Sequence, residues 1–204
     1  MEAMNRSSQL DWATAGRPIS GEIESGDHFL VAEIPVGYVL AVVDGLGHGA
    51  EAAEAARVTV EVLRENARPA LPDLVKQCHT ALVHTRGVAL TLAVINLEGA
   101  YLEWLSVGNV EGLLLRSSNG ADIQRKTILM RGGVVGYHLP DLKVERLPLI
   151  DRDLLVLATD GVESGFSREI RVHSAVQSIA DDIIARFARA SDDALVLSAR
   201  FQGN

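Results

Sequence analysis

The most informative segment of this sequence reads Tyr38-Val39-Leu40-Ala41-Val42-Val43-Asp44-Gly45-Leu46-Gly47-His48-Gly49-Ala50. Apolar residues run up to Asp44, which predicts a strand that is buried on both faces. Three glycines follow within five residues and let a ligand approach the backbone closely. Carboxylate and carbonyl oxygens at a strand end suit a hard divalent cation, so the segment predicts a metal site. A plain strand-to-helix loop is the alternative that this segment alone leaves open.

The composition is that of a folded protein. The chain has 204 residues, of which 48% are hydrophobic and 23% charged, so we expect one domain over residues 1–204. Only 4% are aromatic, and the core should therefore consist mostly of Val, Leu, Ile and Ala. The net charge of -8 argues against a nucleic-acid partner, which would require a basic face.

The location of the protein is expected to be the cytoplasm. The first ten residues are polar and lack the apolar core of a signal peptide, and no apolar run is long enough to span a membrane. No membrane partner is therefore expected. The single cysteine, Cys78, cannot form an internal disulfide, which fits a reducing compartment. Its position in a helical pattern favours a small buried side chain over a catalytic one.

The order of the expected elements favours an α+β or layered sandwich over a doubly wound parallel fold, because strands and helices do not alternate. Asp27 and Asp44 flank different strands of a hairpin, and we expect them at its opposite ends. Helices are expected at 51–66, from Pro72 to about 87, and at 174–190. Strands are expected at 10–14, 17–23, 28–34, 38–43, 88–96, 101–107, 112–116, around 123, at 143–149, 154–158 and 194–199.

Acidic residues at strand ends form the candidate chemistry. Asp44 and Asp160 each follow an apolar strand and precede a glycine, and Asp192-Asp193 precedes another strand. Each alone has the ordinary alternative of a turn or cap. Carboxylates at the rims of neighbouring strands can converge, and a cation would offset their repulsion. Mg²⁺ or Mn²⁺ suits such an all-oxygen site, and two ions could activate a water for attack on a phosphoryl group.

Several of these segments occur in an order that resembles the metal-dependent protein phosphatases, specifically the bacterial SpoIIE-like branch of the protein phosphatase 2C superfamily. The resemblance extends from about residue 10 to 200 and rests most on the Asp-Gly-x-Gly-His-Gly and Thr-Asp-Gly-Val motifs. The matching segments are Ser25-Gly26-Asp27, Asp44-Gly45-Leu46-Gly47-His48-Gly49, Thr91-Leu92, Ser106-Val107-Gly108-Asn109, Thr159-Asp160-Gly161-Val162 and Asp192-Asp193.

The resemblance implies a four-layer α/β/β/α sandwich with two Mn²⁺ or Mg²⁺ ions at one end. In that family the position of Asp44 bridges both ions, and the carbonyl at the Gly45 position binds one. Asp160 and Asp192 would complete the second ion's shell, and Asp27 would bind directly or through water. Asp44 and Asp160 are thus the expected catalytic residues. Asp193 matches a position that is often Asp or Asn.

The chain also departs from the family pattern. Asn109-Val110-Glu111 stands where relatives often have His-x-Pro. No arginine matches the residue that holds the substrate phosphate, and Arg17 is a candidate with a surface residue as the alternative. His48 is either a general acid or a structural turn residue.

The resemblance implies a serine/threonine phosphatase, most similar to the short stand-alone enzymes of the RsbX type. Its expected substrate is a phosphorylated STAS-domain regulator or stressosome scaffold protein. The first alternative is a catalytically weak member of the fold that acts as a binding or regulatory module. A hydrolase of small phosphoesters is a third interpretation, but a P-loop enzyme is not expected because the motif is missing.

Overall fold

The structure is a computed structural model that describes residues 4–6, 9–68, 70–118 and 122–203. Its helices are α1 (Ala50–Glu65), α2 (Leu71–Ala81) and α3 (Val176–Phe187), with one 3₁₀ turn, η1 (Phe166–Arg168). Its strands are β1 (Met4–Arg6), β2 (Leu10–Arg17), β3 (Asp27–Ile34), β4 (Gly37–Gly45), β5 (Val88–Asn96), β6 (Tyr101–Val107), β7 (Glu111–Ser118), β8 (Asp122–Thr127), β9 (Glu145–Pro148), β10 (Leu154–Ala158) and β11 (Ala194–Phe201).

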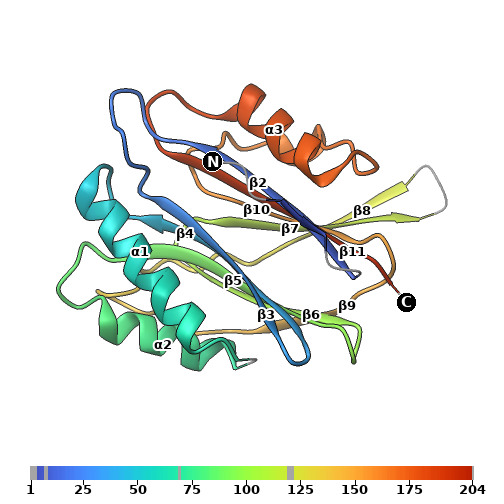
Figure 1. The fold of residues 1–204 in the computed structure, drawn as a ribbon, viewed down its shortest axis with the longest axis horizontal. Coiled ribbons are helices and arrows are strands. Elements are labelled where there is room, and N and C mark those ends of the chain that lie inside the picture. Colours follow the sequence, from blue (N-terminus) through green and yellow to red (C-terminus); the bar gives the residue numbers. More distant parts are fainter. Residues whose placement is uncertain (1–3, 7–8, 69, 119–121, 204) are drawn as a thin grey trace.

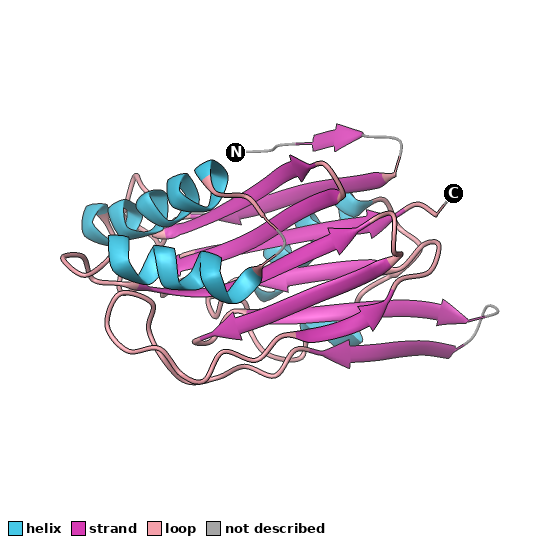
Figure 2. Ribbon diagram, turned by 90° about the horizontal axis from the view of Figure 1, so that it is seen from below, coloured by secondary structure: helices cyan, strands magenta, loops and turns pink. Residues whose placement is uncertain are grey.

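The strands form two antiparallel sheets that pack face to face. One sheet has the order β1-β2-β11-β10-β7-β8 and the other β3-β4-β5-β6-β9. Helices α1 and α2 cover the outer face of the second sheet, and α3 covers the outer face of the first (Figure 1). In the view from below, two helices lie over the strands (Figure 2). The expected four-layer α/β/β/α sandwich is therefore confirmed.

The buried character of the central strands follows from their position between two cores. Alternate residues of a strand point to opposite faces. In β4, Val39 and Val43 pack under α1 and α2, whereas Leu40 and Val42 pack between the sheets. A third core lies between the first sheet and α3. Both faces of β4 thus need apolar residues, which explains its unbroken apolar run.

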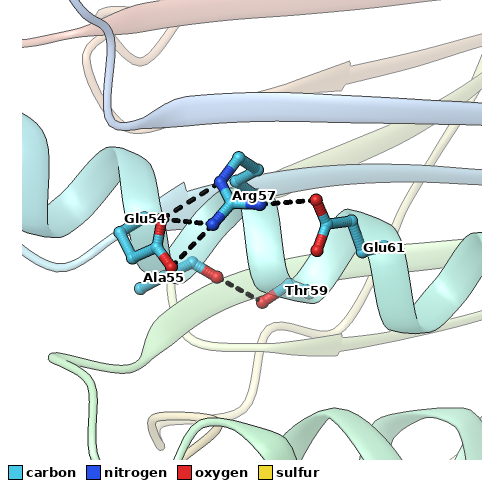
Figure 3. Close-up of polar contacts among 5 residues, drawn as sticks. All are labelled: Glu54, Ala55, Arg57, Thr59 and Glu61. Atoms are coloured by element: carbon cyan, nitrogen blue, oxygen red, sulfur yellow. Dashed lines mark hydrogen bonds and ion pairs between the residues drawn. The ribbon is translucent and has the colours of Figure 1, made fainter.

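Helix α1 packs unusually close to the end of β4. A Cβ on Gly45 would lie only 2.2 Å from the carbonyl oxygen of Ala52, so no larger residue fits at this crossing. On the exposed side of α1, Arg57 bonds both Glu54 and Glu61 (Figure 3). On its buried side, the Thr59 hydroxyl donates to the Ala55 carbonyl oxygen at 2.8 Å (Figure 3). The close packing fixes the strand end on which the candidate site depends.

Three predictions of local structure are wrong. Helix α2 ends at Ala81 rather than near residue 87, because residues 82–85 form turns and a bend. Residues 10–17 form one strand rather than parts of two, because β2 pairs with β11 along its whole length, and residues 18–26 form a loop. Helix α3 is shorter at both ends than the pattern indicates, and Ala188 is extended because it forms a bridge with Val162. Within the described ranges, no helix is long and apolar enough to cross a membrane.

Candidate metal centre

Asp27 and Asp44 lie directly opposite each other at the open end of the β3–β4 hairpin. The expectation that they occupy opposite ends is therefore wrong. In an antiparallel hairpin, the first residue of one strand pairs with the last residue of the next. Asp27 is buried and Asp44 is half-buried. The second sheet thus contributes two carboxylates at one point of its rim.

The first sheet brings three more acidic residues to the same end of the sandwich. Strand β10 ends just before Asp160, and β11 begins just after Asp192-Asp193; the two strands are antiparallel neighbours. The Thr159 hydroxyl donates a hydrogen bond of 2.8 Å to the Asp27 carboxylate and so joins the two sheets here. All four carboxylates that were predicted to be metal ligands, Asp27, Asp44, Asp160 and Asp192, therefore lie at the same end of the sandwich, near enough to influence one another's charge.

The surroundings of these residues disfavour the ionised form of their carboxyl groups. Burial, together with repulsion from Asp193, Asp192 and Asp160, raises the pKa of Asp27 to about 8, although the hydrogen bond from Thr159 opposes this rise. Burial and repulsion by the neighbouring carboxylates raise the pKa of Asp44 to about 9. The pKa of Asp192 is also raised, mainly by burial.

A bound divalent cation fits this arrangement. Among the ion pairs of the described residues, none involves these four carboxylates. Acidic side chains whose pKa values are raised, and which form no ion pair, are what a cation would stabilise. No three described His, Cys, Asp or Glu side chains converge closely enough to hold an ion by themselves. Carbonyl oxygens and waters would have to complete the shell, which is usual for Mg²⁺.

Gly45, the remaining predicted ligand, lies beside Asp44 at the end of β4. Its peptide N–H donates to the carbonyl oxygen of Gly26 at 3.1 Å, which fixes this strand end against the residue before Asp27. On the other side, Gly45 packs directly against the backbone of Ala52 in α1, with no room for a side chain between them. Gly45 is therefore held rigidly next to the carboxylates.

Three polar residues have positions at the site that the sequence analysis did not assign. Thr159 bonds Asp27, as described above, and Asn109 donates its amide N–H to the Asp160 carboxylate at 2.6 Å. Asp193 is buried, and its two carboxylate oxygens accept the backbone N–H groups of Ile19 (2.8 Å) and Gly26 (2.9 Å). Asp193 thus anchors the 18–26 loop.

The signals for these residues were weak. Thr159 and Asn109 both lie within the family-like motifs, and for Thr159 the only local signal is that it precedes Asp160 in the chain. The role of Asp193 depends on a loop about 170 residues earlier in the chain. No local pattern could have revealed it.

Within the described part of the chain, neither His48 nor Arg17 has a hydrogen bond or ion pair to the four candidate metal ligands. His48 is exposed, and its Nδ1 lies 3.2 Å from a carboxylate oxygen of Glu22. The Arg17 guanidinium donates to the carbonyl oxygens of Ala188 and Arg189. Arg17 is half-buried and serves as a link between β2 and the segment that precedes β11.

The fold defined by these layers is that of the metal-dependent protein phosphatases. The structure of RsbX in complex with magnesium superposes with a TM-score of 0.88 and 20% identity, covering 99% of this chain and all of that one. The catalytic domain of the phosphatase PstP, in complex with two manganese ions, gives a TM-score of 0.72 at 18% identity, covering 95% of this chain and 99% of that one. A structure from a study of the bacterial stressosome gives 0.84 at 27% identity, covering 95% and 100%.

Sequence comparison identifies the family. A family model described as stage II sporulation protein E (SpoIIE) matches residues 35–202, and the chain belongs to this family. Stage II sporulation protein E of Priestia megaterium is 26% identical over 163 residues, which cover 76% of this chain. Phosphoserine phosphatase RsbX of Bacillus subtilis (strain 168) is 29% identical over 100 residues, or 49% of this chain. The matches cover 27% and 50% of those two relatives.

Proposed function

We propose that this chain is a metal-dependent serine/threonine phosphoprotein phosphatase, and that residues 1–204 form a single phosphatase domain. The observation that carries the proposal is the placement of four carboxylates from both sheets at one end of this fold, two of them with pKa values raised to about 8 and 9. Membership of the SpoIIE family supports it.

Each proposed ligand has its own role in metal binding. Asp44, the Gly45 carbonyl, Asp160 and Asp192 would hold the ions. Asp27 would bind directly or through water. Mn²⁺ or Mg²⁺ ions, when bound, supply an activated water and neutralise the charge of the phosphoryl group. Asp44 and Asp160 are accordingly the proposed catalytic residues.

The residues around these ligands have positioning roles in the proposal. Thr159 holds the Asp27 carboxylate, and Asn109 orients Asp160. Such hydrogen bonds to metal ligands commonly fix their orientation and tune their affinity. Because Asp193 already accepts two backbone N–H groups, we assign it to the framework of the site rather than to the metal shell.

The proposed substrate is a phosphorylated STAS-domain protein, either a regulator in a partner-switching pathway or a stressosome scaffold. Its dephosphorylation would reset a stress signal in the cytoplasm. The support comes from the relatives: RsbX is a phosphoserine phosphatase, and a similar structure comes from work on the stressosome. No nucleic-acid or membrane partner is proposed.

The test is Mn²⁺-dependent release of phosphate from an aryl phosphate and from a phosphoserine protein. The wild-type chain should hydrolyse both, and Asp44→Asn should lose turnover. Asp182→Asn, which changes an exposed acid on α3, serves as the matched control and should retain activity. Equal activity of Asp44→Asn and wild type would refute the site assignment.

A catalytically weak regulatory module remains the second candidate. The observation that favours it is that no three described acidic, histidine or cysteine side chains hold an ion unaided. Under this alternative the wild-type chain would release no phosphate in saturating Mn²⁺, so the same assay decides between the two functions.

A further inference from the structure

An open cavity of about 680 Å³ lies beside the candidate metal centre. Its walls come from the end of β2, the loop between β2 and β3, the start of β3, the first turns of α1 and the start of β11. Ser25 and Asp27 are among its lining residues. The cavity therefore begins at a proposed metal ligand, and a molecule bound at the metal centre would lie next to it.

The wall of this cavity is largely apolar. Its apolar residues are Pro18, Ile23, Phe29, Ala50, Ala53, Ala194 and Leu195. Ile23 is 97% exposed, the most exposed large hydrophobic residue in the described part of the chain. Covering an exposed isoleucine with an apolar group removes apolar surface from water and so lowers the free energy. This surface is therefore suited to receive an apolar side chain.

The two arginines of the cavity are already engaged, which argues against a second anionic group there. The Arg57 guanidinium is held between Glu54 and Glu61 (Figure 3). The Arg17 guanidinium donates to two backbone carbonyl oxygens. Glu24 and Glu54 also belong to the lining, so the charged groups would not favour a phosphate or carboxylate.

The backbone of β3 offers a place for an extended polypeptide next to the cavity. Strand β3 is the outermost strand of its sheet, with β4 on one side only. An edge strand has free backbone groups that can pair with an incoming segment, while side-chain pockets select its residues. The edge strand, the cavity and the metal centre are contiguous at Asp27.

We propose that this cavity is a specificity subsite that takes an apolar side chain of the phosphoprotein substrate, from a residue close in sequence to the phosphoserine. Ile23 packs on that side chain from the loop between β2 and β3. The inference rests on the proposed phosphatase function and adds to it a substrate class: phosphoserine segments with a neighbouring aliphatic residue.

The experiment uses a set of phosphoserine peptides of small polar residues. Each peptide has one leucine, at a different position before or after the phosphoserine, and one peptide has none. The measured quantity is kcat/KM for phosphate release in Mn²⁺, divided by that for an aryl phosphate. Wild type should prefer leucine at one position about tenfold, a usual discrimination for a small apolar pocket.

Two variants test the cavity from opposite directions. Ile23→Ser removes apolar surface at a position so exposed that folding does not depend on it, and Ala50→Phe fills the cavity from the exposed start of α1. Both should reduce the leucine preference to about twofold or less. Ile150→Ser, at an exposed isoleucine outside the cavity, is the matched control and should keep the full preference.

The outcomes separate the two proposals. A wild-type chain that hydrolyses the aryl phosphate and the peptides without leucine preference overturns the subsite but leaves the phosphatase function intact. Full preference in both cavity variants also overturns the subsite. A wild-type chain that hydrolyses none of the compounds overturns the phosphatase function and the subsite with it.

Discussion

Replacing Asp44 by asparagine should stabilise the metal-free protein even though it destroys the proposed metal site. The pKa of Asp44 is about 9 in the folded chain, against an ordinary value of 3.8. At pH 7 the group is ionised when unfolded and protonated when folded, so folding must take up a proton. This costs at most about 4 kcal/mol, since each of the roughly three pH units above 3.8 costs ~1.4 kcal/mol.

Water that reaches this half-buried carboxylate lowers the cost, and we expect Asp44→Asn to gain about 2 kcal/mol at pH 7. The sign follows from the direction of the shift: stability of the wild type is highest below the unfolded pKa and falls as pH rises towards the folded pKa. The gain from the substitution should therefore be small at pH 4 and grow up to about pH 9.

The assay is urea unfolding with a chelator present, at several pH values, for wild type, Asp44→Asn and the control Asp182→Asn. Added Mn²⁺ should reverse the order, because a cation that binds only the folded wild type stabilises it by mass action. The electrostatic reasoning would be refuted if Asp44→Asn were no more stable than wild type at pH 7, or if its gain did not depend on pH.

Three further substitutions test the framework of the site. Asp193→Ala leaves two backbone N–H groups without their acceptor and should cost about 3 kcal/mol in urea unfolding; no loss would show that the loop is held by other contacts. Thr159→Val removes the donor to Asp27 and should weaken Mn²⁺ binding about tenfold by calorimetry, whereas unchanged affinity would deny the hydroxyl a role at the site. Gly161→Ala would place a Cβ 1.8 Å from the Asp193 carbonyl oxygen and should lower stability by about 3 kcal/mol in thermal denaturation; a wild-type melting temperature would contradict that close packing.

The sequence was most informative about the β3–β4 hairpin, where the apolar pattern and the length of the turn determine the structure. The apolar run before Asp44 predicted a strand with both faces covered, and β4 is such a strand. The pairing of Asp27 with Asp44 was also within reach of the sequence. The two-residue connection between Ile34 and Gly37 fixes the register, and counting back along both strands brings the aspartates together.

Contacts between the sheets could not be predicted from local patterns. Asp192 and Asp193 are adjacent and chemically identical, yet one lies with the candidate ligands and the other bonds the 18–26 loop. Their separate roles arise from the packing of the first sheet on the second. The cavity could not be predicted from local patterns either, because Ile23, Ala50 and Leu195 come from three distant parts of the chain.

The hydrogen bonds of Thr159 and Asp193 have a consequence for how fast the site can exchange its ions. Both cross from the first sheet to the segment that leads into β3, and neither needs a cation. The position of Asp27 and the loop before it are therefore held before any ion arrives, and little backbone ordering in this part accompanies binding. Loading and release of the ions should be limited by the shedding of water from the cation rather than by a structural rearrangement, and amide protection around β3 and β11 should change little between the apo and loaded protein.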